Sequence, residues 1–379
     1  MNKLEERLQL FHTQIAHKET NRIPLLSNFW SWKILDSGYK LSEALYDTDI
    51  LMKSLCVFQE RYNFDTYYET NWRNPLFLSR SMGSVNYIID DINNSISYLD
   101  QTLMDASDYD ALIDNPEKYY WTSYIPRKYP NASIDDIKNT LLLFMQFLDF
   151  FGKGPQTLAE KYDVPVFAEN GLFCPLENLG CGMRGLKEFS IDIRRRPDKV
   201  EAAVEALNHY TAPIKSLYAT TKPGMGSTVV GAQAVMLSHT LMNTKTFERF
   251  YMPFIKELAA YLEAYDKTGF LFMEGDNTRL WDCLKDLPKG MFMVCMENDD
   301  IYEAKKAIGD TIALAGGLKA TTLGTGTPEL CIEEAKRAVD ELGVGGGFVV
   351  TTDKMISFAS DCRRENIKAV TDFLTGYYK

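Results

Sequence analysis

The sequence lacks the features that mark several large classes of protein. Its 379 residues contain no run of about 18 uninterrupted apolar residues, so no membrane-spanning helix and no membrane partner are predicted. The N-terminus, residues 1–7, reads as the start of a charged amphipathic helix and not as a signal sequence, which predicts a cytoplasmic protein. The seven cysteines form no Cys-x-x-Cys pair, and such scattered thiols fit a reducing compartment.

Positive charge is also scarce. The formal net charge is -11, and the one basic cluster, residues 194–196, directly precedes Pro197 at an expected helix start. A protein that follows nucleic-acid phosphates needs a long basic surface, so no nucleic-acid partner is expected. With 45% hydrophobic and 25% charged residues, the chain has the composition of a globular protein with a sizeable core.

No glycine fingerprint follows the first expected strand, residues 23–28, as it would in an open, doubly wound dinucleotide-binding sheet. From that strand onward, eight apolar strand-like runs alternate with helical stretches. This alternation predicts an α/β fold with a closed (β/α)8 TIM-type barrel, and the open sheet is the alternative. Residues 84–100 alternate apolar and polar side chains, which predicts a β-hairpin in an elaborated N-terminal part. Without a repeat or linker, we expect one domain spanning 1–379.

Two successive apolar runs end abruptly on polar side chains. Residues 270–273 lead into Glu-Gly-Asp-Asn at 274–277, and residues 291–296 lead into Glu297 and Asn298. One such run alone would be read as a strand end with solvated acids, whereas two in succession favour a site at the C-terminal mouth of a barrel. The residues expected to act as catalytic acids are Glu274, Asp276 and Glu297.

Motifs in the C-terminal half carry a resemblance. The run Thr246-Phe-Glu-Arg-Phe-Tyr-Met-Pro-Phe-Ile-Lys-Glu-Leu258 is followed by a glycine, a strand and an acidic tip. Gly316-Gly-Leu318, Gly324-Thr-Gly-Thr-Pro-Glu-Leu330, Gly345-Gly-Gly-Phe-Val-Val350 and Arg364-Glu-Asn-Ile-Lys-Ala369 come next, in that order. This series resembles the uroporphyrinogen decarboxylase superfamily, which implies a TIM-type barrel with its site in the C-terminal mouth.

Two branches of that superfamily give different expectations. Uroporphyrinogen decarboxylases resemble one another in an N-terminal Arg-Gln-Ala-Gly-Arg-Tyr segment whose arginines hold substrate carboxylates. The equivalent segment here, residues 28–38, contains no arginine, so a highly acidic porphyrinogen would meet little compensating charge. A lyase of that kind is therefore the lesser alternative.

The other branch contains the corrinoid-dependent methyltransferases. Its thiol-methylating members are similar in a His-x-Cys pair at the tip of the sixth strand and a Cys at the tip of the last, which together hold zinc. Phe272 and Glu274 stand where the pair would be, and the last-strand position falls near residues 351–353. A thiol-activating zinc site of that kind is therefore absent or rebuilt. Some ether-cleaving members are similar in using acidic zinc ligands, and the resemblance implies Glu274, Glu297 and Cys295 as candidate ligands, although a buried strand cysteine is the simpler reading of Cys295.

The carboxyl-rich strand tips favour an ether substrate. Cleavage of a methyl ether needs an acid or a Lewis acid to stabilise the departing oxygen, whereas a thiol acceptor needs a base or metal. The aromatic residues of the N-terminal half suit a methoxylated ring, and the chain resembles the methyltransferase I components of anaerobic O-demethylases. The residues expected to bind substrate are Trp30, Trp32, Tyr67, Gln233, His239 and Asn277.

A partner protein is also expected. The chain has no Asp-x-His-x-x-Gly segment of the kind that binds cobalamin, so the cobamide would arrive on a separate corrinoid carrier protein. Zinc as a second cofactor is left open by the sequence. In this hypothesis Co(I) attacks the methyl group while the pocket stabilises the leaving oxygen. The alternatives are transfer from methylcorrinoid to a thiol or pterin, and a non-enzymatic barrel that binds a small molecule.

Overall fold

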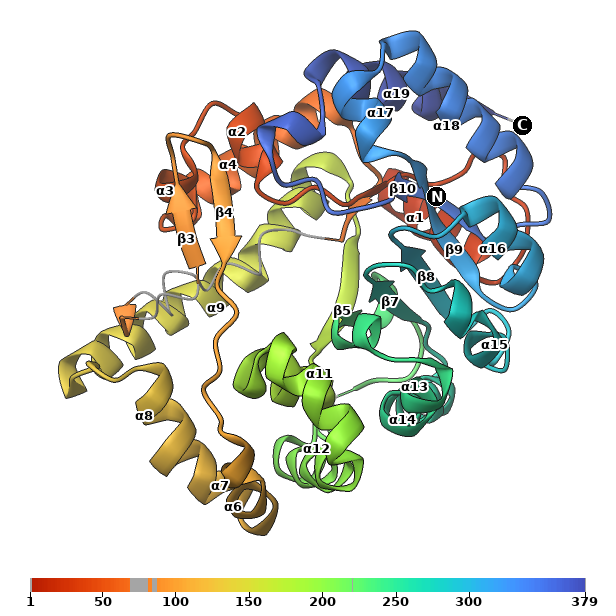
Figure 1. Cartoon of the computed structure of the whole chain (residues 1–379). Coiled ribbons are helices and arrows are strands. Elements are labelled where there is room, and N and C mark those ends of the chain that lie inside the picture. The colour runs from red at the N-terminus through yellow and green to blue at the C-terminus, as the bar shows by residue number, and fades with distance from the viewer. Residues whose placement is uncertain (1, 69–80, 84–86, 220, 379) are drawn as a thin grey trace.

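The computed structural model describes residues 2–68, 81–83, 87–219 and 221–378, and its central element is a ring of parallel strands (Figure 1). Six strands form one hydrogen-bonded sheet in the order β10-β9-β8-β7-β6-β5, and β1 pairs with β2 in a second sheet. The parallel strands are β1 (Leu26–Ser27), β2 (Thr66–Tyr67), β5 (Val166–Leu172), β6 (Thr228–Met236), β7 (Gly269–Met273), β8 (Phe292–Met296), β9 (Ala313–Leu318) and β10 (Phe348–Thr352).

Short contacts join the two sheets into a barrel. Single bridges from Leu25 to Val350 and from Phe29 to Ile356 place β1 beside β10. On the other side, the Thr66 hydroxyl donates a hydrogen bond of 2.7 Å to the carbonyl of Pro165, just before β5. Among the described residues no strand ladder joins β2 to β5, so the ring has a seam there. The predicted α/β class with a TIM-type barrel is confirmed, and the seam is the difference.

Alternate residues of the strands fill the barrel interior. Phe270 and Phe272 of β7 point inward, where the ring of Tyr68 stacks on Phe272 with centroids 5.5 Å apart. Helix α1 (Lys3–Ile15) closes the N-terminal end with Phe11 and two aliphatic side chains. The buried interior cluster consists of Leu8, Phe11, Ile15, Leu26, Tyr68, Phe167, Val229, Val230, Phe270, Phe272, Met293, Cys295, Ala313, Ala315 and Val349.

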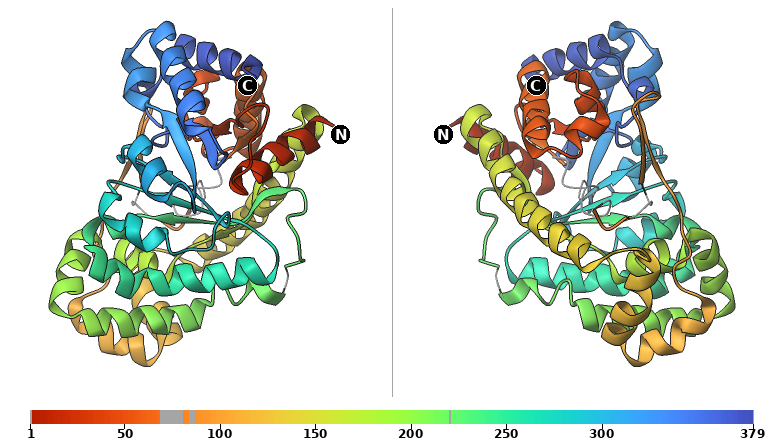
Figure 2. Two further views of the ribbon diagram at one scale, coloured as in Figure 1. Left: turned by 90° about the vertical axis from the view of Figure 1, so that its right-hand side faces the viewer. Right: turned by 90° about the vertical axis from the view of Figure 1, so that its left-hand side faces the viewer.

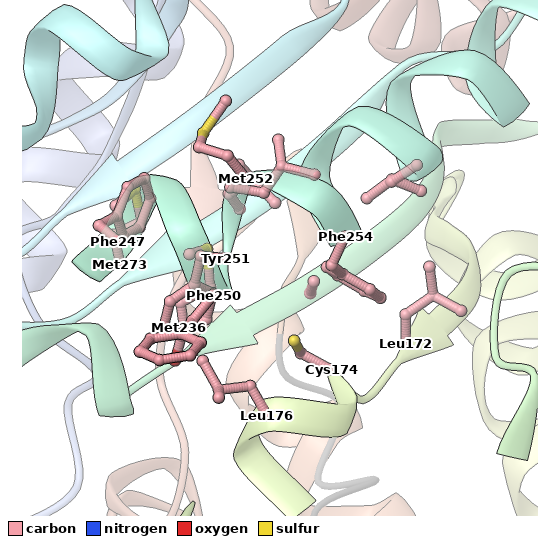
Figure 3. Close-up of a cluster of buried hydrophobic side chains, with 14 of the residues drawn as sticks. Leu172, Cys174, Leu176, Met236, Phe247, Phe250, Tyr251, Met252, Phe254 and Met273 are labelled. Carbon is pink, nitrogen blue, oxygen red and sulfur yellow. The ribbon is translucent and has the colours of Figure 1, made fainter. Parts of the chain in front are cut away.

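Helices cover the outside of the barrel, and the opposite faces of the strands bury against them. Figure 3 shows part of this layer, where Phe247 and Tyr251 pack with Met236 of β6 and Met273 of β7. The longer helices of the layer are α4 (Thr48–Tyr62), α11 (Leu186–Arg195), α12 (Pro197–Thr211), α13 (Thr244–Phe250), α14 (Met252–Ala264), α16 (Ile301–Ile308), α18 (Pro328–Leu342) and α19 (Arg364–Gly376). Shorter helices are α2 (Trp32–Asp36), α3 (Leu41–Ala44), α10 (Pro175–Glu177), α15 (Trp281–Leu284) and α17 (Ala320–Thr325).

An N-terminal elaboration stands on one side of the barrel (Figure 1). It contains the predicted hairpin, formed by β3 (Tyr87–Asp90) and β4 (Ser95–Tyr98); residues 84–86 of the predicted hairpin segment lie outside the described residues. Three short helices, α6 (Tyr109–Asp114), α7 (Pro116–Tyr119) and α8 (Ile125–Lys128), lead to the long helix α9 (Ile134–Tyr162). Within the described ranges, no helix has both the length and the apolar composition needed to cross a bilayer.

Candidate active site

The C-terminal ends of β7 and β8 place two carboxylates side by side. Phe272 and Cys295 are register partners that face the barrel interior, and Glu274 and Glu297 follow each of them by two residues. Because side chains alternate along a strand, both glutamates continue the inward face into the barrel mouth. Glu297 Oε2 accepts a hydrogen bond of 2.9 Å from the backbone N–H of Gly275, which ties the two strand ends together.

Gly275 makes this contact because of its backbone conformation. Its φ is +73°, in the region that favours glycine, and a Cβ there would lie 3.0 Å from Cγ2 of Thr240. The turn directs the N–H of Gly275 toward Glu297 and leads the chain away from the mouth. Both glutamates are half-buried.

A third carboxylate, Asp353, lies at the end of β10. It follows Thr351 by two residues, and its Oδ1 accepts a hydrogen bond of 3.0 Å from the N–H of Ala320 at the start of α17. Burial raises the pKa of Asp353, and the charge of Glu297 raises it further. The environment of Asp353 therefore favours its protonated form, which the sequence did not single out.

Cys295 does not suit the metal role expected of it. The side chain is fully buried, with Sγ 3.9 Å from the carbonyl of Thr352, and burial raises the pKa of the thiol well above its usual value. A thiol is a zinc ligand only as the thiolate. In the described part of the chain, no three His, Cys, Asp or Glu side chains group in a way that could hold a metal ion. The set Glu274, Glu297 and Cys295 therefore does not fit zinc.

Asp276, His239 and Asn277 form hydrogen bonds within the loops that follow β6, β7 and β8. Asp276 is exposed, and its carboxylate accepts a hydrogen bond of 2.8 Å from the N–H of Thr278, which lowers its pKa. His239 is fully buried, with Nε2 2.7 Å from Oδ1 of Asn277. The amide nitrogen of Asn277 in turn donates to Oδ2 of Asp299 at 2.9 Å. These contacts connect the ends of β6, β7 and β8 and hold the loops of the barrel mouth in place.

The protonation of His239 follows from this network. The amide nitrogen of Asn277 donates to carbonyl and carboxylate oxygens, so its Oδ1 is left to accept a proton carried on Nε2 of His239. Burial lowers the pKa of the ring, which keeps the histidine neutral. Its Nδ1 is buried and has no hydrogen-bond partner among the residues that the structure describes.

Two of the aromatic candidates belong to the outer layer. Trp32 is 4% exposed, and its indole N–H donates a hydrogen bond of 3.0 Å to the carbonyl of Cys362. The Tyr67 hydroxyl donates to Gln59 at 2.7 Å, and its ring packs with Phe58 outside the barrel. The strand alternation instead turns Tyr68, the next residue, into the interior. Neither Trp32 nor Tyr67 is therefore brought to the mouth.

Buried polar atoms without partners gather on the inward faces. Asn28 is 1% exposed, and neither atom of its amide has a hydrogen-bond partner in the described structure. Three further side-chain atoms have no hydrogen-bond partner in the described structure, namely the Thr351 hydroxyl, the side-chain amide oxygen of Gln233 and the indole nitrogen of the half-buried Trp30. Asn28 and Thr351 follow the interior residues Leu26 and Val349 by two positions, so they share the inward face. A buried unpaired polar atom costs about 1–3 kcal/mol, so this set indicates contacts with a ligand or water.

Gln233 also borders a cavity at the seam of the barrel. The cavity has a volume of about 530 Å³ and lies between β2, β5 and the C-terminal part of α9. That volume accommodates a small aromatic molecule. Its walls include Tyr67, Tyr68, Pro155, Gln156, Phe167, Glu169 and Gln233.

Glu177, which supports the loop after β6, could not be identified from the sequence. This carboxylate is fully buried and accepts hydrogen bonds from the N–H groups of Leu237, at 2.7 Å, and Ser238, at 3.0 Å, and from the Tyr251 hydroxyl. It therefore fixes the segment that carries His239. Glu177 lies in an ordinary apolar helix start, and the three residues that donate these hydrogen bonds are 60 or more positions away in sequence, so no local pattern marks it.

One family model and one solved structure agree with this architecture. Residues 157–377 match the family model described as uroporphyrinogen decarboxylase (URO-D). A solved methyltransferase from Methanosarcina mazei has the same fold, with a TM-score of 0.63 and 17% sequence identity over 98% of each chain. A B12-independent methionine synthase from Shewanella sp. W3-18-1 aligns over 59% of this chain and 65% of its own, with 10% identity and a TM-score of 0.35. No curated protein matches the chain.

Proposed function

The chain belongs to the uroporphyrinogen decarboxylase family, and from this membership we propose that it is a methyltransferase. It would move a methyl group from a small methoxylated aromatic ether to the cobalt of a corrinoid on a separate carrier protein. The observation that carries the proposal is the carboxyl group of Asp353, whose environment favours the protonated form. It lies close enough to Glu297 to feel its charge, and Glu297 in turn is bonded to the residue after Glu274. The fold shared with a methanogen methyltransferase is consistent with it.

The reaction requires an oxygen to leave with an electron pair. When the bond between the methyl carbon and the ether oxygen breaks, that pair stays on the oxygen, and a proton from the enzyme neutralises it. Asp353 can hold this proton because burial and the charge of Glu297 raise its pKa. Glu274, at the end of β7 and next to Glu297 at the end of β8, is the second candidate donor. A reduced corrinoid supplies a cobalt nucleophile that accepts the methyl group.

Substrate orientation falls to the inward polar atoms. Asn28, Trp30 and Thr351 offer amide, indole and hydroxyl donors that have no partner in the described structure. Such donors suit the oxygen substituents of a methoxylated ring. Tyr68 and Phe272 form an aromatic floor beneath the mouth, on which a ring can pack.

The test supplies the purified chain with a dimethoxybenzene and chemically reduced free cobalamin. We expect release of the methoxyphenol together with loss of the reduced cobalamin absorption. Glu274→Gln should lower this rate by about 100-fold or more, as for loss of an acid-base group. If the wild type demethylates no methoxyarene but transfers a methyl group from methylcobalamin to a thiol, the proposal is wrong. Methyl transfer would then run from the corrinoid to the acceptor.

A matched variant separates chemistry from folding. Glu333→Gln makes the same change at an exposed position of α18 and should leave the rate unchanged. Calorimetric binding of the dimethoxybenzene without cobalamin gives a readout apart from turnover, and Asn28→Ala should weaken it. Full turnover in Glu274→Gln would remove Glu274 from the site.

A further inference from the structure

The long helix α9 carries a continuous apolar face that no described element covers. Seven large side chains on its N-terminal half are between 42% and 72% exposed. The right-hand view of Figure 2 shows the helix lying along the outside of the molecule. These side chains, the α9 face, are Ile134, Ile137, Leu141, Leu142, Phe144, Met145 and Leu148.

The spacing of the α9 face is that of a helix that pairs with another helix. Ile134, Ile137, Leu141, Phe144 and Leu148 follow one another at intervals of three and four residues in strict alternation. This is the heptad spacing of a two-helix seam. The inner side of the same helix is already used, since Thr140 contacts Ser81 through their hydroxyl groups.

The size of the α9 face suits a stable interface. Seven side chains of about 200 Å² each, at these exposures, leave on the order of 800 Å² open, which is what one partner contributes to an interface of standard size. Contiguous apolar patches on monomers are usually no larger than about 300–600 Å². The face is therefore larger than a monomer normally exposes.

Charge decides which partner and which orientation fit. Ten residues without a charge, 139–148, separate Lys138 from Asp149. Two such helices in parallel would set Lys138 against Lys138 and Asp149 against Asp149. In an antiparallel pair about a twofold axis between residues 143 and 144, each Lys138 instead faces the Asp149 of the other copy. We propose that the α9 face binds a second copy of this chain as an antiparallel helix pair, forming a symmetric dimer.

The proposal does not depend on the proposed function, although the two are connected in space. The C-terminal part of α9, with Pro155 and Gln156, lines the cavity at the barrel seam. A dimer built on the N-terminal half of the helix leaves that part free. Each copy would keep its own cavity and mouth.

Sedimentation equilibrium of the full chain tests the dimer. The wild type should have twice the 43.2 kDa of one chain at micromolar concentration. The double variant Leu141→Glu and Phe144→Glu places four charges in the dimer at the centre of the seam, beside the twofold axis. Its dimer dissociation constant should rise by at least about 30-fold, as for loss of a single hot spot. Leu330→Glu, which changes an exposed leucine of α18, is the matched control and should remain dimeric.

A charge exchange tests the orientation. Lys138→Glu should weaken the dimer, and the combination of Lys138→Glu with Asp149→Lys should restore it. Circular dichroism of each variant confirms that α9 still forms. A wild type that sediments as a monomer at 100 µM would overturn the proposal, as would an undiminished dimer in the double variant, and failed restoration would overturn the antiparallel arrangement.

Discussion

At the scale of single residues, the mouth combines carboxylates with different environments. Asp276 is exposed and its pKa is lowered by its hydrogen bonds to Thr278, whereas burial raises the pKa of Asp353. Of these two carboxyl groups, only Asp353 has a pKa shifted in the direction that a proton donor near neutral pH requires. The sequence could place acids at the ends of β7 and β8. It could not predict the direction of their pKa shifts, because the burial of each carboxyl group depends on residues from distant strands.

Replacing Asp353 with Asn should change both activity and the pH dependence of stability. The folded-state pKa is raised, so this carboxyl contributes stability that is present below the unfolded pKa and lost as the pH rises through the folded value. Asp353→Asn should therefore be more stable than the wild type at neutral pH, by on the order of 1 kcal/mol. Its demethylation rate should fall by about 100-fold.

Urea unfolding between about pH 4.5 and pH 7.5 measures the first effect. The stability advantage of Asp353→Asn should grow with pH, because the Asn oxygen still accepts the N–H of Ala320 while the ionisation penalty is gone. Asp310→Asn, at an exposed position, should show no such trend. A constant difference across this range would show that Asp353 is not protonated preferentially in the folded state.

At the scale of elements, a strand or helix could be predicted where its sequence shows a regular run or alternation of apolar residues. The five-residue apolar runs of β7 and β8 predicted strands correctly, and Glu274 and Glu297 directly follow these strands. Helix α9, in contrast, runs to Tyr162 through Gly152, Gly154 and Pro155, which are helix-breaking signals in isolation, so its full length could not be predicted from the sequence. Trp32 was expected to bind substrate but lies in the outer layer. Strand β1 ends at Ser27, and Trp32 already belongs to helix α2.

The closing helix α1 offers a test at this scale. Phe11 is fully buried at the N-terminal end of the barrel, within the interior cluster. Phe11→Ala should lower the free energy of unfolding by about 3–5 kcal/mol, because the barrel cannot collapse onto the cavity that remains. Ile92→Ala, in the exposed turn of the hairpin, should change it by less than about 0.5 kcal/mol. Equal effects in the two variants would show that α1 does not seal the barrel.

At the scale of the whole molecule, the barrel is held unevenly around its circumference. Strand β7 is fully buried and hydrogen-bonded to β6 and β8, whereas β5 is bonded on one side to β6 and has exposed positions at Glu169 and Gly171. The cavity lies at this weaker side. The sequence could not reveal the seam, because eight strand-like runs fit a fully closed ring equally well.

Hydrogen exchange should therefore report a seam between β2 and β5. Backbone amides of β5 should exchange at least about 100-fold faster than those of β7, since local opening there breaks one ladder and not two. Thr66→Val removes the hydroxyl bond to Pro165, worth about 1 kcal/mol, and should speed exchange at residues 166–172 several-fold. Exchange at residues 269–273 should stay unchanged, because β7 is bonded through β6 and β8 and not through Thr66. Equal protection of β5 and β7 in the wild type would mean that the ring is closed in solution, and access to the cavity would then have to come through the C-terminal mouth.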